Sequence, residues 1–92
     1  MANSRDFSNL PKGTVNITAK IIEKYRKNAK LSRKSLSDKL LLIGFDISMN
    51  AIYDIEKGTR TVTDYEICAI AKALKLPVQD LLINYYDSLD DI

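Results

Sequence analysis

Apolar residues recur at three- and four-residue steps along most of this chain, and that spacing constrains its fold more than any other feature. Residues so spaced lie on one side of an α-helix. No run of four or more residues alternates apolar and polar positions between turn residues, as a strand would. We therefore predict an all-α fold. The 92 residues, 46% of them apolar, suffice for one domain with a single core.

Capping residues set the boundaries of the first three predicted helices. The first begins near Asn16 and runs to about Ala29. Ser32 is a predicted N-cap for the second helix, and Ser48 for a short third one. The glycines at 44 and 58 are predicted to end these two helices, because glycine readily adopts the left-handed conformation that follows a helix.

The remaining helices are marked by a capping box and a proline. Thr63 and Glu66 have the spacing of a capping box, which predicts the start of a fourth helix. Cys68 falls on the apolar side of that helix and is predicted to be a core residue rather than a reactive thiol. Pro77 is tolerated in a first turn and predicts a fifth helix. The acidic tail over 85–92 either extends that helix into an apolar dimer contact or frays, because acids near a helix C-terminus oppose the helix dipole.

Composition excludes several classes of function. The chain has no His and one Cys, which leaves no internal disulfide, no common zinc site and no His-based acid–base catalysis. We therefore expect no enzymatic activity, no metal and no cofactor. No apolar run approaches the ~18 residues of a membrane span, so we predict a cytoplasmic protein with no membrane contact. Residues 1–13 lack periodicity and are predicted to form a flexible N-terminal arm.

The net charge of +2 divides unevenly along the chain. Residues 1–60 hold 12 Lys and Arg against 6 Asp and Glu, a balance of +6, whereas 61–92 hold 2 Lys against 6 acids, a balance of −4. A basic half of this kind suits a surface that binds phosphates. It suits equally well a helix face that is simply solvated.

The predicted third helix, residues 49–57, has two different sides. Three of its residues share one mostly core-like side, namely Ile52, Ile55 and Glu56. A varied polar set shares the other side, namely Met49, Asn50, Tyr53, Asp54 and Lys57. Amide, carboxylate and ammonium groups can bind base edges or phosphates, and a major groove accepts one helix. The alternative is a short connecting helix with ordinary surface residues.

These residues resemble a known family. Residues 31–82 are similar to the helix-turn-helix domain of the phage-repressor/Cro type, the XRE family, and with the first helix the resemblance covers about 17–84. The residues that carry it are Leu31-Ser32, Leu36, Leu40, Ser48, Ala51-Ile52, Ile55-Glu56-Lys57-Gly58, the run from Ala69 to Leu74, Val78, and Asp80-Leu81-Leu82. The resemblance implies a compact five-helix lambda-repressor-like domain over 14–84.

The resemblance also implies roles for single residues. The third helix becomes the recognition helix in the major groove. The residues that would reach base edges are Met49, Asn50, Tyr53 and Asp54, and those that would contact the phosphate backbone are Arg33, Lys57, Thr59, Arg60 and Thr61. Arg26 would form a structural ion pair with Glu56, although it could instead be one more phosphate-facing base.

The chain departs from the family pattern in two places. Seven residues, Leu41 to Ile47, stand where the family usually has two, which predicts a second helix about one turn longer and a remodelled turn. Ser37 stands where a small Ala usually packs.

The resulting expectation is a dimeric repressor that binds double-stranded DNA. The alternative is a protein-interaction module, of the antitoxin or anti-repressor type, that uses the same surface on a protein partner.

Overall fold

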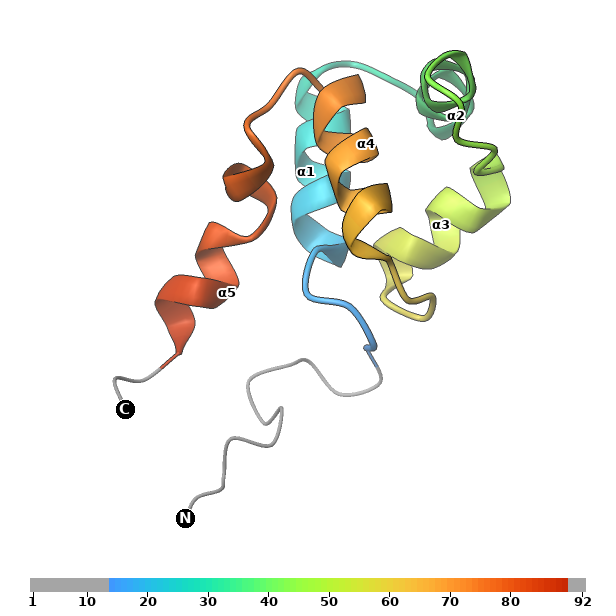
Figure 1. Ribbon diagram of the computed structural model, residues 1–92. Helices are drawn as coiled ribbons and strands as arrows, with labels where there is room; N and C mark the ends of the chain where they lie inside the picture. The colour runs from blue at the N-terminus through green and yellow to red at the C-terminus, as the bar shows by residue number, and fades with distance from the viewer. Residues whose placement is uncertain (1–13, 90–92) are drawn as a thin grey trace.

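Helices account for all the regular structure in residues 14–89, the part of the chain that this computed structural model describes, and no strand occurs there (Figure 1). The elements are α1 (Ala19–Asn28), α2 (Arg33–Leu42), α3 (Met49–Lys57), α4 (Asp64–Ala73), the 3-10 helix η1 (Val78–Leu81) and α5 (Ile83–Ser88). The predicted all-α fold is confirmed. The arm predicted over 1–13 lies outside the described residues.

The predicted helix caps are present. Ser32, Ser48 and Thr63 each accept a hydrogen bond from the backbone N–H three residues further on, and the capping box at Thr63 is complete. Gly44 and Gly58 follow α2 and α3 with φ of +92° and +83°. These bonds satisfy backbone groups that a helix end leaves without an intrahelical partner.

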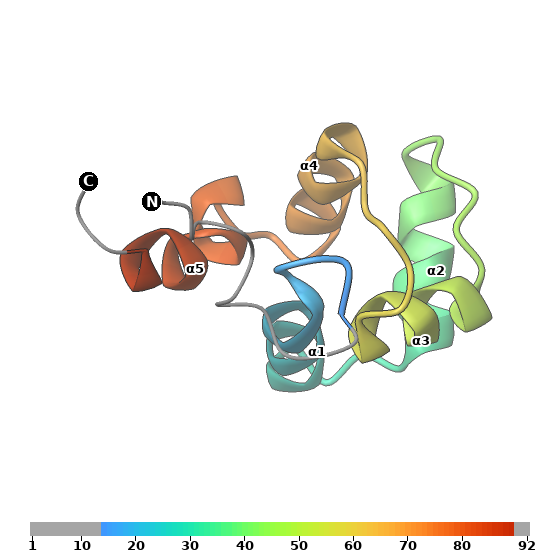
Figure 2. The same ribbon diagram turned by 90° about the horizontal axis from the view of Figure 1, so that it is seen from below.

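The core lies where α3 packs against α1 and α2, and where α4 packs against α2 and η1. Its buried side chains come from every element except α5, and they are Ile22, Leu36, Leu40, Ile47, Ile52, Ile55, Ala69, Ile70, Ala71, Leu74 and Leu81. The view from below shows α5 at the opposite end of the molecule from α2 and α3 (Figure 2). The core therefore fixes α3 firmly, whereas α5 adds no buried residue.

The first helix begins at Ala19, three residues after the predicted start. Asn16 Oδ1 accepts hydrogen bonds from the backbone N–H of Thr18 at 2.9 Å and from its hydroxyl at 3.0 Å. A short polar side chain that binds nearby backbone competes with helix formation. Residues 16–18 therefore form a tight turn before the helix.

The predicted fifth helix is broken. The chain from Val78 first forms η1, which carries Leu81 into the core, and the backbone at Leu82 (φ −117°) then departs from helical values before α5 begins. The tighter 3-10 turn interrupts the helix where Leu81 packs into the core. Residues 85–88, assigned to the tail, belong to α5.

The prediction that Cys68 is a core residue was wrong, because its side chain is exposed. Successive residues of an α-helix lie about 100° apart, so Cys68 lies about 160° around α4 from the buried Ile70. The apolar face of α4 is narrower than its sequence suggested.

The expanded connection between α2 and α3 is ordered by hydrogen bonds. The N–H of Gly44 donates to Leu41 O at 3.0 Å and the N–H of Phe45 to Leu40 O at 2.9 Å, the pair of bonds that ends a helix at a left-handed residue. Ile47 then returns to the core with 4% of its surface exposed. The extra residues thus continue α2 to Leu42 and form the loop that follows.

Candidate nucleic-acid interface

The helix α3 turns one side to the core and the other to solvent. The side chains that it buries are Ile52, Ile55 and Glu56. The side chains that it exposes include those predicted for base edges, with Met49 51% and Tyr53 45% exposed and with Asn50, Asp54 and Lys57 also classed as exposed. The structure thus brings the four predicted base-reading residues together on one accessible face.

Arg26 of α1 meets Glu56 of α3 inside the domain. Arg26 Nε lies 2.6 Å from Glu56 Oε2, and Nη2 lies 3.1 Å from Oε1. The remaining guanidinium nitrogen donates to Leu31 O at 2.8 Å. Hydrogen bonds to Glu56 raise the pKa of Arg26, despite the opposing effect of burial. The structure places Arg26 against Glu56 and away from solvent.

Arg33, the first residue of α2, shares the same carboxylate. Its Nε lies 2.9 Å from Glu56 Oε1, its Nη2 lies 4.0 Å from Glu23 Oε2, and its side chain is 35% exposed. Two guanidinium groups therefore converge on Glu56. No local pattern around Arg33, which is predicted to contact phosphate, indicates that it takes part in this cluster.

Tyr53 lies beside two cations. The Cζ atom of Arg33 is 5.0 Å from the centroid of its ring, and the Nζ atom of Lys57 is 5.1 Å from it. Arg33 comes from the start of α2 and Lys57 from the end of α3. The ring therefore joins the two helices on the outer side of the domain.

The loop after Gly58 holds the three other predicted backbone contacts. Thr59 donates from its hydroxyl to Asp54 O at 3.3 Å, and Thr61 is exposed. Arg60 donates to both carboxylate oxygens of Glu66 at 3.3 and 3.2 Å. Burial opposes ionisation of Glu66, but hydrogen bonds from Arg60 and Thr63 hold its pKa below the ordinary value. Arg60 thus braces the capping box of α4 while its side chain stays 33% exposed.

Asn16 is a residue of this region that the sequence reasoning missed. Its Nδ2 donates to Ile55 O at 3.2 Å and to Arg60 O at 2.9 Å, and the N–H of Val15 donates to Gly58 O at 2.7 Å. The segment before α1 is therefore fastened to the end of α3. An amide placed before a helix was the available signal, but the partners are about forty residues away in sequence.

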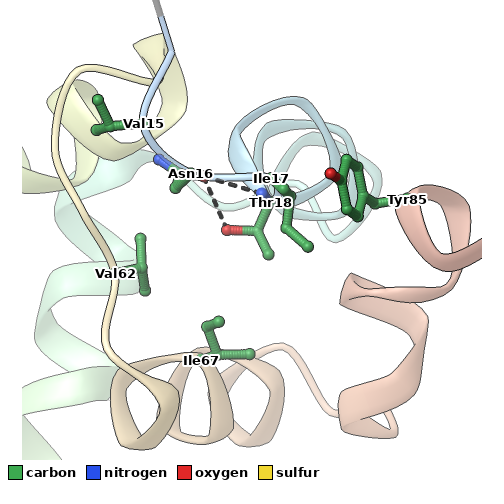
Figure 3. A pocket seen from close by; sticks show the side chains of 7 residues that line it. All are labelled: Val15, Asn16, Ile17, Thr18, Val62, Ile67 and Tyr85. Atoms are coloured by element: carbon green, nitrogen blue, oxygen red, sulfur yellow. Dashed lines mark hydrogen bonds between the residues drawn. The ribbon is translucent and has the colours of Figure 1, made fainter. Parts of the chain in front are cut away.

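A pocket of about 300 Å³ lies between this segment, α4 and α5 (Figure 3). Its lining is largely apolar and consists of Val15, Asn16, Ile17, Thr18, Val62, Ile67 and Tyr85. The close-up shows the two hydrogen bonds that join Asn16 and Thr18, and Tyr85 reaching in from α5. This lining offers no carboxylate, amine or thiol with which to perform chemistry.

Within residues 14–89, no group of three or more His, Cys, Asp or Glu side chains could hold a metal ion. None of the helices in that range combines the length and apolar character that crossing a membrane requires.

Comparison with known proteins gives one match. A family model, HTH_3, described as helix-turn-helix, matches residues 22–81, which is more than half of the chain and runs from within α1 to the end of η1. No curated protein and no solved structure matched.

Proposed function

The chain belongs to HTH_3, a non-enzymatic family of helix-turn-helix DNA-binding transcriptional regulators, and on that premise we propose that it is a dimeric, sequence-specific repressor that acts in the cytoplasm and reads the major groove with α3. The observation that carries the proposal is the two-sidedness of α3. Ile52, Ile55 and Glu56 are buried on its inner side, while the outer side exposes Met49, Asn50, Tyr53, Asp54 and Lys57. A major groove admits a helix presented in this way.

Three exposed side chains of α3 have the chemistry to read base edges. Asn50 can bond to adenine N7 and N6, and Asp54 can accept from cytosine N4. Met49, at the start of the helix, can contact a thymine methyl group. Tyr53 shares this face, but the two cations beside its ring favour a different role.

The groups that would contact phosphates flank this face. Lys57 ends α3, and the hydroxyls of Thr59 and Thr61 follow in the exposed loop. Arg33 and Arg60 are each about one third exposed and already paired with a glutamate. They would approach phosphates with the nitrogens that those pairs leave exposed.

The buried pair of Arg26 and Glu56 supports the proposal indirectly. It joins α1 to the inner side of α3 with two hydrogen bonds. We assign it the role of holding the recognition helix at a fixed angle rather than that of touching DNA.

The dimer contact is proposed on α5. Ile83 is 41%, Tyr86 70% and Leu89 44% exposed, so this helix carries apolar surface that its own domain leaves uncovered. Because α5 lies at the far end from α3, a dimer joined there would leave both recognition helices free (Figure 2). Two copies related by a two-fold axis would read two half-sites about one helical turn apart.

Selection of preferred duplexes from a random pool tests the proposal. We expect enrichment of two inverted half-sites, and affinity that falls steeply with salt, by ~0.9 in log K per log unit of salt for each phosphate contact. Binding that ignored salt, or a pool with no enriched duplex, would rule out a sequence-specific regulator. Enrichment of a single half-site, together with a monomer in sedimentation, would exclude the dimer but not sequence-specific binding.

A protein-interaction module remains a second candidate, because one apolar patch lies beside α3. Leu41 is 59%, Leu42 86% and Ile43 44% exposed, all in the expanded connection. An antitoxin or anti-repressor could bind its protein partner there and over α3. Co-purification of a stoichiometric protein, together with no shift of any duplex by the isolated chain, would favour this candidate.

A further inference from the structure

We propose that Tyr53 is a positioning residue for phosphate binding, whose ring holds Arg33 and Lys57 in place, and that it does not read a base. This inference rests on the proposed function, since it assigns a role within the DNA-binding face. It replaces the role that the family resemblance implies for the same residue.

The geometry around the ring is the first argument. Both cations lie within about 5 Å of the ring centroid, at 5.0 Å for Arg33 and 5.1 Å for Lys57. The face of a tyrosine ring is electron-rich and attracts a cation within about 6 Å of its centroid. The ring thus attracts two cations from different helices at once.

The two cations differ in what else holds them. Arg33 is also bonded to the buried carboxylate of Glu56 at 2.9 Å. Lys57 has no ion pair within residues 14–89, so the ring is the group that fixes its position. Loss of the ring should therefore release Lys57 more than Arg33.

The placement of these groups indicates what they do together. Arg33 begins α2 and Lys57 ends α3, so the cations belong to the two helices of the helix-turn-helix. The duplex carries a closely spaced row of phosphate charges along each side of the groove. A cation held by a ring loses less side-chain freedom on meeting a phosphate than a free lysine does.

The same geometry limits what Tyr53 itself can read. With both cations at the ring, its hydroxyl remains as the group that could bond to a base edge. Replacing tyrosine by phenylalanine removes the hydroxyl and keeps the ring, whereas replacement by leucine removes both. The two substitutions therefore separate base reading from positioning.

The experiment measures binding of Y53F and Y53L to the preferred duplex and to a random duplex over a range of salt. We expect Y53F to match the wild type. We expect Y53L to bind both duplexes about 3- to 30-fold more weakly, as loss of one or two cation–π contacts implies. Its salt slope should be shallower by ~0.9, the value of one phosphate contact, with its sequence preference unchanged. Y65L is the control and should bind like the wild type, because within residues 14–89 this exposed tyrosine has no cation over its ring.

A second comparison uses K57Q in the wild type and in Y53L. If the ring positions Lys57, the substitution costs less affinity in Y53L than in the wild type. Equal costs in the two backgrounds would overturn the proposal, and so would a Y53F protein as weak as Y53L or a Y53L protein with altered base preference and an unchanged salt slope.

The NMR chemical shifts of the Lys57 ε-methylene protons test the contact with the ring in the absence of DNA. The ring current of residue 53 should move these resonances upfield in the wild type and in Y53F but not in Y53L. The same chemical shifts in all three proteins would contradict the contact between Lys57 and the ring. If the wild type bound no duplex, the proposed function would be lost and this role with it. If the wild type bound and Y53L kept its affinity and slope, the role of Tyr53 alone would be lost.

Discussion

Arg26 and Glu56 form a bidentate ion pair between α1 and α3, with side chains only 7% and 2% exposed. A buried carboxylate is satisfied while it keeps its cationic partner. Removal of either member of the pair leaves an unpaired charge in the interior, which strongly destabilises the fold. Because Arg33 also bonds to Glu56, this single residue connects three helices. The angle at which α3 is presented therefore depends on a group that never reaches the surface.

Replacing Glu56 by alanine should lower the free energy of unfolding by about 3–5 kcal/mol, because it strands Arg26 in the interior. Urea denaturation measures this loss. The control is E23A, which removes a more exposed glutamate paired with Lys27 and should cost less than about 1 kcal/mol. The double variant R26M/E56M should be more stable than E56A, because it leaves no buried charge at Arg26. Equal stability of E56A and E23A would mean that burial of the pair contributes nothing.

Asn50→Ala should weaken binding to the preferred duplex by about 1–3 kcal/mol and relax the preference at one base pair. The reason is loss of a side-chain amide that can bond twice to adenine. Titration against duplexes with each base at each position measures both effects. Gln79→Ala removes an exposed amide from η1 and should change neither. An N50A protein with wild-type affinity and preference would remove Asn50 from the reading face.

Gly58→Ala should destabilise the domain more than Gly44→Ala. Both glycines have positive φ, so each substitution strains the backbone by about 1 kcal/mol. A Cβ at Gly58 would also lie 2.6 Å from Thr14 Cγ2, whereas a Cβ at Gly44 meets nothing within 4 Å. We expect a loss of about 2–4 kcal/mol for G58A in urea denaturation. Equal losses of unfolding free energy in G58A and G44A would show that Thr14 can move away from the added Cβ without destabilising the domain.

Glu66→Gln should destabilise the domain by about 1 kcal/mol at neutral pH, because it removes the charge that Arg60 binds while glutamine still completes a capping box. The pKa of Glu66 is lowered in the folded state, so its contribution is present above the ordinary value of 4.5 and is lost as pH falls through the lower folded value. The difference between the two proteins should therefore shrink below pH 4.5. Asp87→Asn removes an exposed carboxylate with no ion pair in the described structure and should change the stability at neutral pH little. A gap for E66Q that stayed constant as the pH fell below 4.5 would contradict this assignment.

Local signals in the sequence predicted most of the helices. Ser32, Ser48 and Thr63 begin helices because each cap depends on residues within one turn of it. The glycines at 44 and 58 follow helices for an equally local reason. The two sides of α3 also follow from its own periodicity, so the exposed face with Asn50 was predictable.

Contacts between distant segments account for what the sequence did not show. The later start of α1 follows from local bonds between Asn16 and Thr18, but the bonds that fasten Asn16 to the end of α3 reach residues some forty positions later. The family resemblance implies phosphate contacts for Arg33 and Arg60, but their glutamate partners become neighbours only in the fold. The break before α5 likewise falls where Leu81 packs into the core formed by other elements.

Ser37 has a consequence for exchanging parts between proteins of this architecture. Its hydroxyl donates to Ile47 O at 2.6 Å, across the base of the expanded connection. The two departures from the family pattern are thus one feature, in which the serine on α2 secures the loop that the additional residues form. A graft of residues 41–47 into another scaffold would need Ser37 as well, since Ser37 anchors the last residue of the loop, Ile47, and the two belong to one transferable unit.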